Sequence, residues 1–191
     1  MNAAFSPHSR HSPQTLPDID SLSIQLRRDL RSDHAGETGA VYIYRAILQF
    51  TRDPELIAFA TEHLATEERH LAAFENWLPA REKSRLIPLW RIAGWSLGAV
   101  SLLGGRAGVY RTIEAVERFV VIHYQEQLDY LEDDKELSTV TELLRSFMDD
   151  EDSHRADAEH RVAGEPGVLS KVWSAIVGGG SSAAVKVCRV I

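Results

Sequence analysis

The sequence contains a single cysteine, Cys188, among 191 residues. One cysteine cannot form a disulfide within the chain, and it cannot supply the several thiolates of an iron–sulfur cluster or a cysteine-based zinc site. Positive charge is also scarce, because 21 Lys and Arg residues stand against 28 Asp and Glu residues, which gives a net charge of −7. A general nucleic-acid-binding protein needs basic surface to neutralise phosphates, so we expect no nucleic acid among the partners.

The first 21 residues lack any apolar run, and they include three prolines and one arginine. A secretory signal needs an apolar core, and a transit peptide needs an amphipathic, Arg-rich helix; this segment has neither. We therefore predict a disordered tail over residues 1–21. One folded domain is predicted over residues 22–191, which is long enough for a full hydrophobic core.

The rest of the chain lacks the alternating apolar and polar runs, bounded by turn signals, that are typical of β-strands. Apolar residues recur instead at helical spacing. We predict four long helices, at about 22–51, 54–77, 106–130 and 136–162. Four long helices with an extra segment between the second and the third are typical of a four-helix bundle with one long crossover. The predicted fold is therefore all-α and ferritin-like.

Two histidines follow glutamates at a spacing of three residues on apolar helix faces: His70 after Glu67, and His154 after Glu151. Residues three or four apart share one face of a helix, so the members of each pair point the same way. One such pair would be a common solvated pair, but an unpaired carboxylate on an apolar face is unfavourable. Glu68 falls on a different face from Glu67. We expect both pairs to point into the core.

A further glutamate lies on an apolar helix face upstream of each pair, Glu37 before Glu67 and Glu117 before Glu151, which makes an internal repeat of a helix pair. One glutamate from each of two helices, with Glu-x-x-His from each of the other two, is the ligand set of carboxylate-bridged di-iron sites. Four converging carboxylates without positive charge would repel one another or take up protons. The sequence thus predicts two iron ions, Fe²⁺ or Fe³⁺, and six ligands: Glu37, Glu67, His70, Glu117, Glu151 and His154.

Other polar residues lie close in the sequence to these ligands. His123 and Tyr124 lie on the helix of Glu117, where a role beside the metal or the substrate and a purely structural role are both open. Glu114 and Asp150 could orient the ligand histidines. His63 is one turn from a predicted ligand, but a satisfied or solvated histidine explains it more simply.

Two segments, residues 83–113 and 168–191, contain basic residues but no acidic residue, and they hold three of the four tryptophans. They are also the most apolar parts of the chain. Such surfaces are typical of proteins that lie on anionic lipid, so we predict that both segments face a membrane. Residues 88–105 within the first segment are too short and too rich in glycine for a spanning helix. The alternative is that these segments pack on the bundle or on a second subunit, as in a homodimer.

Five stretches carry a resemblance to a known family, which extends from about residue 25 to the C-terminus. They are DHAGETGA (33–40), ATEERHLAAFENWLP (65–79), IPLWRIAGWSLGAVSLLGG (87–105), AVERFVVIHYQEQL (115–128) and MDDEDSHRADA (148–158). The chain resembles demethoxyubiquinone hydroxylase, the di-iron enzyme of ubiquinone biosynthesis. The DHAGE motif together with the Pro-Trp-Gly segment distinguishes this family from ferritin-like proteins at large.

The resemblance implies that the six predicted ligands bind iron and that His123 and Tyr124 serve electron or proton delivery. It implies an O₂-dependent monooxygenase that hydroxylates the ring of a polyprenylated 3-methyl-6-methoxy-1,4-benzoquinol, with electrons ultimately from NADH. It also implies a peripheral membrane protein, and other proteins of ubiquinone biosynthesis are expected partners. Without a clear transit peptide, we expect the cytoplasmic face of a bacterial cell membrane.

The alternative function is that of a ferritin-like ferroxidase or iron-storage protein. Such a protein would share the six ligands, but it would not need a basic, Trp-rich apolar surface.

Overall fold

The structure is a computed structural model that describes residues 15–162 and 167–191. Within these ranges the chain forms six α-helices, four short 3₁₀ helices and no strand. The α-helices are α1 (Ile24–Phe50), α2 (Pro54–Trp77), α3 (Ile87–Ser101), α4 (Gly105–Leu131), α5 (Ser138–His160) and α6 (Val168–Cys188). The 3₁₀ helices are η1 (Ile19–Ser21), η2 (Ala80–Glu82), η3 (Leu102–Gly104) and η4 (Lys135–Leu137). The predicted all-α class and the four long helices are confirmed.

The boundary between α1 and α2 follows from local sequence. Asp53 caps α2, since its carboxylate accepts a hydrogen bond from the backbone N–H of Glu55 at 3.0 Å. Pro54 occupies the first position of the helix, where its missing N–H is not needed. At the start of α1, the Ser23 hydroxyl caps in the same way and accepts from Leu26 at 3.2 Å.

Helices α1 and α2 form one hairpin and α4 and α5 form another, and the two hairpins pack together as a bundle. The buried apolar side chains form two clusters. One includes Tyr44, Phe59, Tyr110 and Ile113, and the other includes Leu26, Leu30, Phe74, Leu128 and Leu144. On each of the four helices the predicted ligands lie between the residues of the two clusters. The ligands are therefore held at the middle of the bundle, away from both ends.

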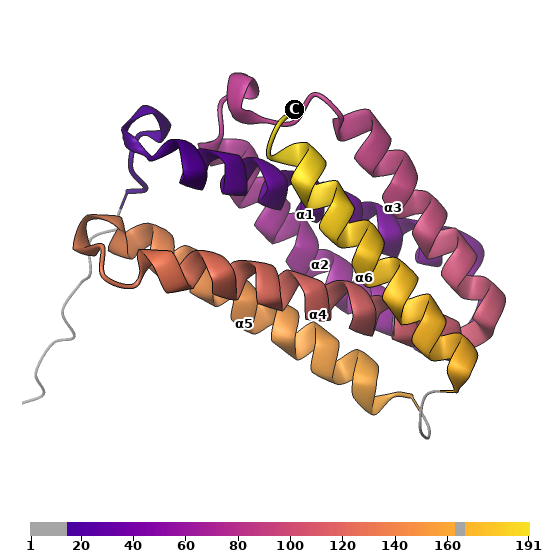
Figure 1. The fold of residues 1–191 in the computed structure, drawn as a ribbon. Helices are drawn as coiled ribbons and strands as arrows, with labels where there is room; N and C mark the ends of the chain where they lie inside the picture. Colours follow the sequence, from indigo (N-terminus) through magenta and orange to yellow (C-terminus); the bar gives the residue numbers. More distant parts are fainter. Residues whose placement is uncertain (1–14, 163–166) are drawn as a thin grey trace, which may run out of the picture.

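The two remaining helices lie on the outside of this bundle. Helix α3 packs along α1, and α6 crosses α1 and α4 (Figure 1). The close approach of α3 depends on glycine, because a β-carbon at Gly94 would overlap the carbonyl oxygen of Gly39. A β-carbon at Gly98 would overlap the carbonyl oxygen of Ile43 in the same way. These two glycines let α3 lie directly against the backbone of α1.

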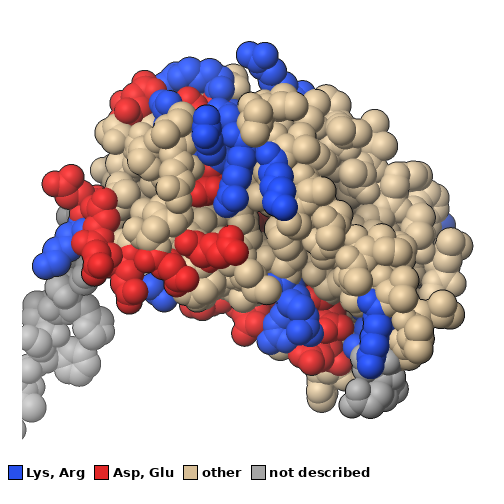
Figure 2. Space-filling model, in the orientation of Figure 1, with Lys and Arg blue, Asp and Glu red and all other residues tan. Residues whose placement is uncertain are grey.

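Helices α3 and α6 also leave many large apolar side chains exposed. They are Leu89, Ile92, Trp95 and Val100 on α3, and Val168, Leu169, Val172, Ile176 and Val187 on α6. Figure 2 shows mostly uncharged residues over the α3 side of the molecule, whereas acidic residues gather near the α4–α5 connection. In the described part of the chain, no helix has the length and the apolar character needed to cross a membrane. This agrees with the prediction for residues 88–105.

The packed part of the chain begins earlier than the predicted boundary at residue 22. Ile19 is buried, and the Trp77 indole N–H donates a hydrogen bond to the carbonyl oxygen of Pro17 at 3.0 Å. The end of the predicted tail therefore packs on the bundle, because its apolar residues cover the C-terminal end of α2. Residues 1–14 of the predicted tail lie outside the described residues.

Candidate metal centre

The six predicted ligands come together from α1, α2, α4 and α5. They make two overlapping groups, and within each group one oxygen or nitrogen atom of every residue lies within 4.8 Å of the others. The first group is Glu37, Glu67, His70 and Glu151, and the second is Glu67, Glu117, Glu151 and His154. All six residues are buried. The geometry matches two neighbouring metal ions, each with a histidine and a glutamate of its own and two glutamates in common.

Both histidines direct the same ring nitrogen into the cluster. His70 Nδ1 lies 2.9 Å from Glu151 Oε1 and 3.6 Å from Glu37 Oε2. His154 Nδ1 lies 3.2 Å from oxygens of both Glu67 and Glu151. The spacing of three residues within Glu-x-x-His produces this arrangement, because the two side chains rise from the same helix face. The predicted choice of Glu67 over Glu68 agrees with burial, since the Glu68 side chain is 48% exposed and pairs with Arg45.

The electrostatics of the cluster show a demand for positive charge. Burial, together with repulsion from Glu151, raises the pKa of Glu67 and of Glu117 well above the ordinary value. Burial would lower the pKa of His70, but the nearby carboxylates of Glu151 and Glu37 outweigh it and raise the pKa to about 11. The nearby carboxylates of Glu151 and Glu67 likewise raise the pKa of His154 to about 10 against the effect of burial.

Glu151 is the carboxylate that these imidazoles stabilise. Burial would raise its pKa, but hydrogen bonds from His154 and His70 lower the pKa to about 2. Two further carboxylate oxygens, Glu37 Oε2 and Glu67 Oε1, are buried and make no hydrogen bond. A buried carboxylate oxygen without a donor is unfavourable unless a cation binds it. The residues present therefore fit a metal pair, and a set of carboxylates with imidazoles suits iron.

Hydrogen bonds from outside the cluster hold the ligands in place. The Tyr124 hydroxyl donates to Glu37 Oε1 at 2.6 Å, and the Tyr44 hydroxyl donates to Glu117 Oε1 at 3.2 Å. Asp150 Oδ2 lies 3.0 Å from Nε2 of His70, so Asp150 orients that ring, a role that the sequence left open. Tyr44 was not among the predicted site residues. Its position on the same face of α1 as Glu37 was the available signal.

His63 has a closer relation to the cluster than we expected. Its ring stacks on that of His154, with ring centroids 4.1 Å apart, and its nitrogens lie 3.2 Å from the Tyr44 hydroxyl and 3.1 Å from Asp157 Oδ2. Burial, together with the neighbouring His154, lowers the pKa of His63 to about 4. His63 is thus a satisfied histidine that also fixes the position of a ligand.

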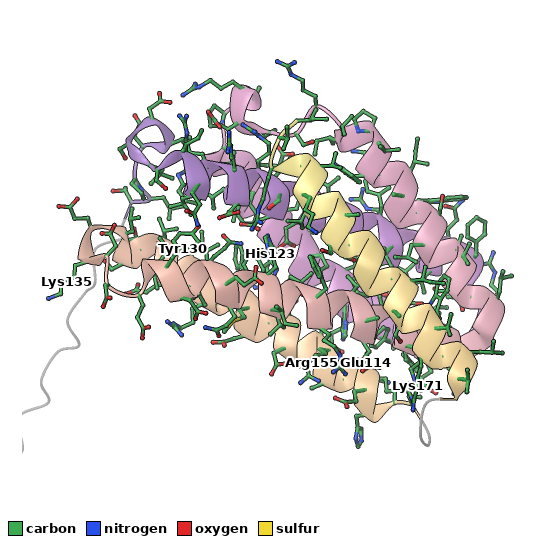
Figure 3. All side chains as sticks on the ribbon, in the orientation of Figure 1. Glu114, His123, Tyr130, Lys135, Arg155 and Lys171 are labelled. Atoms are coloured by element: carbon green, nitrogen blue, oxygen red, sulfur yellow. The ribbon has the colours of Figure 1, made fainter. Side chains whose placement is uncertain are left out.

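Glu114, one of the two residues considered for orienting a ligand histidine, does not do so in the structure. Its carboxylate does not reach a ligand histidine, because it pairs with Arg111 at 3.2 Å and with Arg118 on the same helix. These arginines lie three residues before and four residues after Glu114, so they neutralise it locally. Figure 3 shows Glu114 well apart from His123, which lies nearer the middle of the bundle.

His123 contacts Ser32 and Asp33 in the first half of α1 rather than the cluster itself. Its Nε2 lies 3.0 Å from Asp33 Oδ1 and 3.2 Å from the Ser32 hydroxyl. The Gln127 amide donates to the same Asp33 oxygen at 2.9 Å. Burial raises the pKa of Asp33, although His123 opposes this rise. Asp33, whose role the sequence analysis did not identify, therefore links His123 to the helix that carries Glu37.

A cavity of about 350 Å³ lies between α1, α3, α4 and α6 and reaches the cluster. Its inner end is formed by Glu37, Glu67, Glu117 and Glu151, with His123 and Tyr124 beside them. Small residues form much of the wall: Gly36, Gly39, Ala40, Ala93, Gly94, Gly180, Ser181 and Ala184. The rest is largely apolar and includes Trp90 and Trp173. An apolar molecule with a compact polar end fits such a space.

Comparison with known proteins agrees with this geometry. The model of one protein family, described as ubiquinone biosynthesis protein COQ7, matches residues 24–188. The chain belongs to the COQ7 family. The match spans all six helices and the six clustered residues, so the cluster and the cavity are features of a COQ7-family domain.

Three COQ7-family relatives illustrate the similarity. A protein of Dictyostelium discoideum named NADPH-dependent 3-demethoxyubiquinone 3-hydroxylase, mitochondrial, is 37% identical over 171 residues, which cover 84% of this chain and 75% of the relative. The 3-demethoxyubiquinol 3-hydroxylase of Rhodospirillum rubrum is 37% identical over 144 residues, 73% of this chain and 66% of the relative. A human protein with the same name as the first is 32% identical over 150 residues, 76% of this chain and 68% of the relative.

Proposed function

We propose that the chain is a 3-demethoxyubiquinol 3-hydroxylase, a monooxygenase of ubiquinone biosynthesis. The observation that carries this proposal is the apolar cavity that ends on the buried carboxylates Glu37, Glu67, Glu117 and Glu151. A ring C–H bond of the quinol becomes C–OH, one atom of O₂ enters the product, and the other leaves as water. The two electrons and one of the two protons that this balance requires come from a reduced nicotinamide cofactor, NADH by our prediction, and the second proton comes from water.

The proposed metal is a pair of irons in a ferritin-like four-helix bundle. Glu37 and His70 would hold one ion, Glu117 and His154 the other, and Glu67 and Glu151 would bridge them. When bound, the iron pair supplies the site that activates O₂. The chain's own contribution is to place these ligands and to exclude water with two apolar clusters, one on each side.

The proposed substrate, the quinol of a polyprenylated 3-methyl-6-methoxy-1,4-benzoquinone, would enter along the cavity with its ring innermost. Small residues such as Gly36 and Gly39 leave room for a flat ring beside the carboxylates. The isoprenoid tail would leave between α3 and α6, where Trp90, Leu97 and Trp173 line the cavity. Burial of the tail's apolar surface there stabilises the complex by the hydrophobic effect.

His123 and Tyr124 are proposed to act at the inner end of this cavity, which both residues line. The Tyr124 hydroxyl donates a hydrogen bond of 2.6 Å to Glu37, so it fixes the position of a proposed metal ligand. Tyr124 would also contact the ring of the bound quinol. His123, held by Asp33, is placed to exchange a proton with a quinol hydroxyl.

The exposed apolar side chains of α3 and α6 support the proposal that the protein lies on a membrane surface. Both helices flank the mouth of the cavity, and neither contains an acidic residue. A quinol with a long tail could then pass from lipid to the cavity without crossing water. The bacterial relative is compatible with the proposed location on the cytoplasmic face of a bacterial cell membrane.

One assay tests the proposed function. The iron-loaded protein receives demethoxyubiquinone, NADH and O₂, and mass spectrometry looks for a product heavier by one oxygen atom, which becomes labelled when ¹⁸O₂ is supplied. We expect labelled product. Absence of product, together with uptake of many irons per chain, would instead identify a ferroxidase or iron-storage protein.

A further inference from the structure

A second groove lies on the surface between α4 and α6, with a volume of about 460 Å³. Three basic residues and one acidic residue line it, so its formal charge is +2 in a chain with a net charge of −7. The basic residues are Arg111, Arg118 and Lys171, and the acidic residue is Glu114. This groove is distinct from the cavity that reaches the metal cluster, although both share Phe119 as a wall.

The charged end of the groove is organised by the pairing of the two helices. The Trp173 indole N–H donates to the Thr112 hydroxyl at 2.8 Å, which fixes the start of α6 beside the start of α4. Figure 3 shows Glu114 and Lys171 at the same end of this helix pair. Lys171 is exposed and has no ion pair within residues 15–162 and 167–191, whereas the Arg118 side chain is 57% exposed and shares Glu114 with Arg111. Lys171 and the exposed Arg118 therefore supply positive charge along the groove.

The other end of the groove is apolar. Phe119 and Ile122 follow Arg118 on α4, and Ile122 is 54% exposed. On α6, the groove residue Lys171 is directly followed by Val172, which belongs to the exposed apolar surface of that helix. The groove therefore runs along the border of the proposed membrane-facing surface. A ligand with an anionic head and an apolar body matches this distribution.

We propose that the α4–α6 groove binds the phosphate headgroup of an anionic phospholipid. Arg118 and Lys171 provide the cations, and Phe119 and Ile122 contact the upper part of the lipid chains. This inference rests on the proposed membrane association. It goes further because it names the class of lipid that is bound and the residues that recognise the lipid headgroup. A zwitterionic headgroup would bring its own positive charge to the groove, so it would gain less from these cations.

The test uses full-length, iron-loaded protein and vesicles of phosphatidylcholine with or without phosphatidylglycerol. The double variant Arg118→Gln, Lys171→Gln should bind the phosphatidylglycerol vesicles about 25-fold more weakly than the wild type, about fivefold for each basic side chain lost. Binding to pure phosphatidylcholine should stay unchanged. Glu114→Gln, which removes the acidic residue among those that line the groove, should bind the anionic vesicles more tightly.

Lys135→Gln with Arg155→Gln is the matched control. It also removes one lysine and one arginine; Lys135 is exposed like Lys171, and Arg155 pairs with carboxylates on its own helix like Arg118. These residues belong to η4 and α5, which do not line the groove. We expect the control to bind anionic vesicles nearly as tightly as the wild type. An equal loss in both double variants would overturn the proposal.

Three further outcomes separate the groove from the proposed function. If the wild type binds both kinds of vesicle equally well, the proposal that the groove binds anionic phospholipid is overturned, but membrane association is not. If the wild type binds no vesicles but hydroxylates a short-chain quinol normally in detergent, the proposals of lipid binding in the groove and of membrane association are both overturned. The proposed hydroxylase activity would stand. Unchanged vesicle binding in the Arg118 and Lys171 variant, with slower oxidation of NADH, would assign the groove to a nucleotide phosphate instead.

Discussion

Glu67 on α2 and Glu151 on α5 each belong to both groups of atoms that could hold a metal ion. A carboxylate has two oxygens and can bind one ion with each, so these two residues are placed to bridge a pair. Glu37 belongs to one group alone, as Glu117 does to the other. The loss of a shared ligand and the loss of an unshared ligand should therefore have different consequences.

Glu151→Gln should lose both irons, because both proposed sites depend on this carboxylate. Glu37→Gln removes a ligand from one site and should weaken mainly that site, leaving about one iron per chain. Metal analysis of the purified variants measures the ratio of iron to protein. Glu68→Gln is the control, since Glu68 neighbours Glu67 but faces solvent, and it should retain the wild-type iron content. Full iron in Glu151→Gln would refute the bridging assignment.

The metal-free protein should lose stability as the pH rises above neutrality. The folded pKa values of His70 and His154, about 11 and about 10, exceed their ordinary value of 6.5. Their stabilising effect is complete below pH 6.5 and is lost as the pH rises through these values. The raised pKa values of Glu67 and Glu117 act in the same direction, because folding then retains protons that the unfolded chain releases.

Iron replaces those protons, so the loaded protein should show a much flatter profile over the same range. Urea unfolding between about pH 6 and pH 10, with and without iron, measures the difference. On the acid side, Glu151 has its pKa lowered to about 2, so its contribution is present above 4.5 and disappears as the pH falls through 2. If the metal-free protein is as stable at pH 10 as at pH 6, the raised pKa values of the cluster residues are contradicted.

Tyr124→Phe should reduce hydroxylation about 10- to 100-fold while leaving the fold intact, which is the usual effect of losing a group that orients a metal ligand. The ring that packs in the core remains, but Glu37 Oε1 loses its hydrogen bond of 2.6 Å. Steady-state turnover, with the iron spectrum as a second readout, measures the effect. Tyr130→Phe on the same helix is the control, because the Tyr130 hydroxyl binds Asp29 and not a ligand. Equal activity of the two variants would remove Tyr124 from the mechanism.

Gly180→Leu should raise the KM for the quinol without loss of iron. Gly180 lines the cavity on α6 and has open space where a side chain would start, so leucine would fill the space proposed for substrate. Gly179→Leu is the control, because it places the same bulk one residue away, at a position that does not line the cavity. This variant should keep the wild-type KM. Kinetics with quinols of increasing tail length measure both variants. The same KM change in both would argue against entry along this cavity.

Gly94→Ala should destabilise the protein by about 1–3 kcal/mol, the usual range for overpacking. Its new β-carbon would overlap the carbonyl oxygen of Gly39, so α3 must move away from α1. The urea midpoint measures this change. Gly104→Ala is the control, because no atom lies within 4 Å of the new β-carbon, and its urea midpoint should stay near that of the wild type. Since α3 forms one wall of the cavity, Gly94→Ala should also bind quinol more weakly.

The sequence by itself determined the features that depend on a single helix. The 3.6-residue period sets which residues share a face, so it separated Glu67 from Glu68 and paired each glutamate with its histidine. The local chemistry of Asp53 and Pro54 determined where α1 ends and α2 begins. The role of Glu114, which the sequence left open, also has a local basis, because its two arginine partners lie on the same helix, three and four residues away.

Only the tertiary structure decided which residues from different helices meet. The contacts of Tyr124 with Glu37, Tyr44 with Glu117, and His63 with His154 join residues 87, 73 and 91 positions apart in the chain. The period of one helix carries no information on its rotation against another, since that rotation depends on the packing of both surfaces. The substrate cavity and the α4–α6 groove arise the same way. The cavity depends on the close approach of α3 to α1, which Gly94 permits, and the groove depends on the docking of α6 on α4.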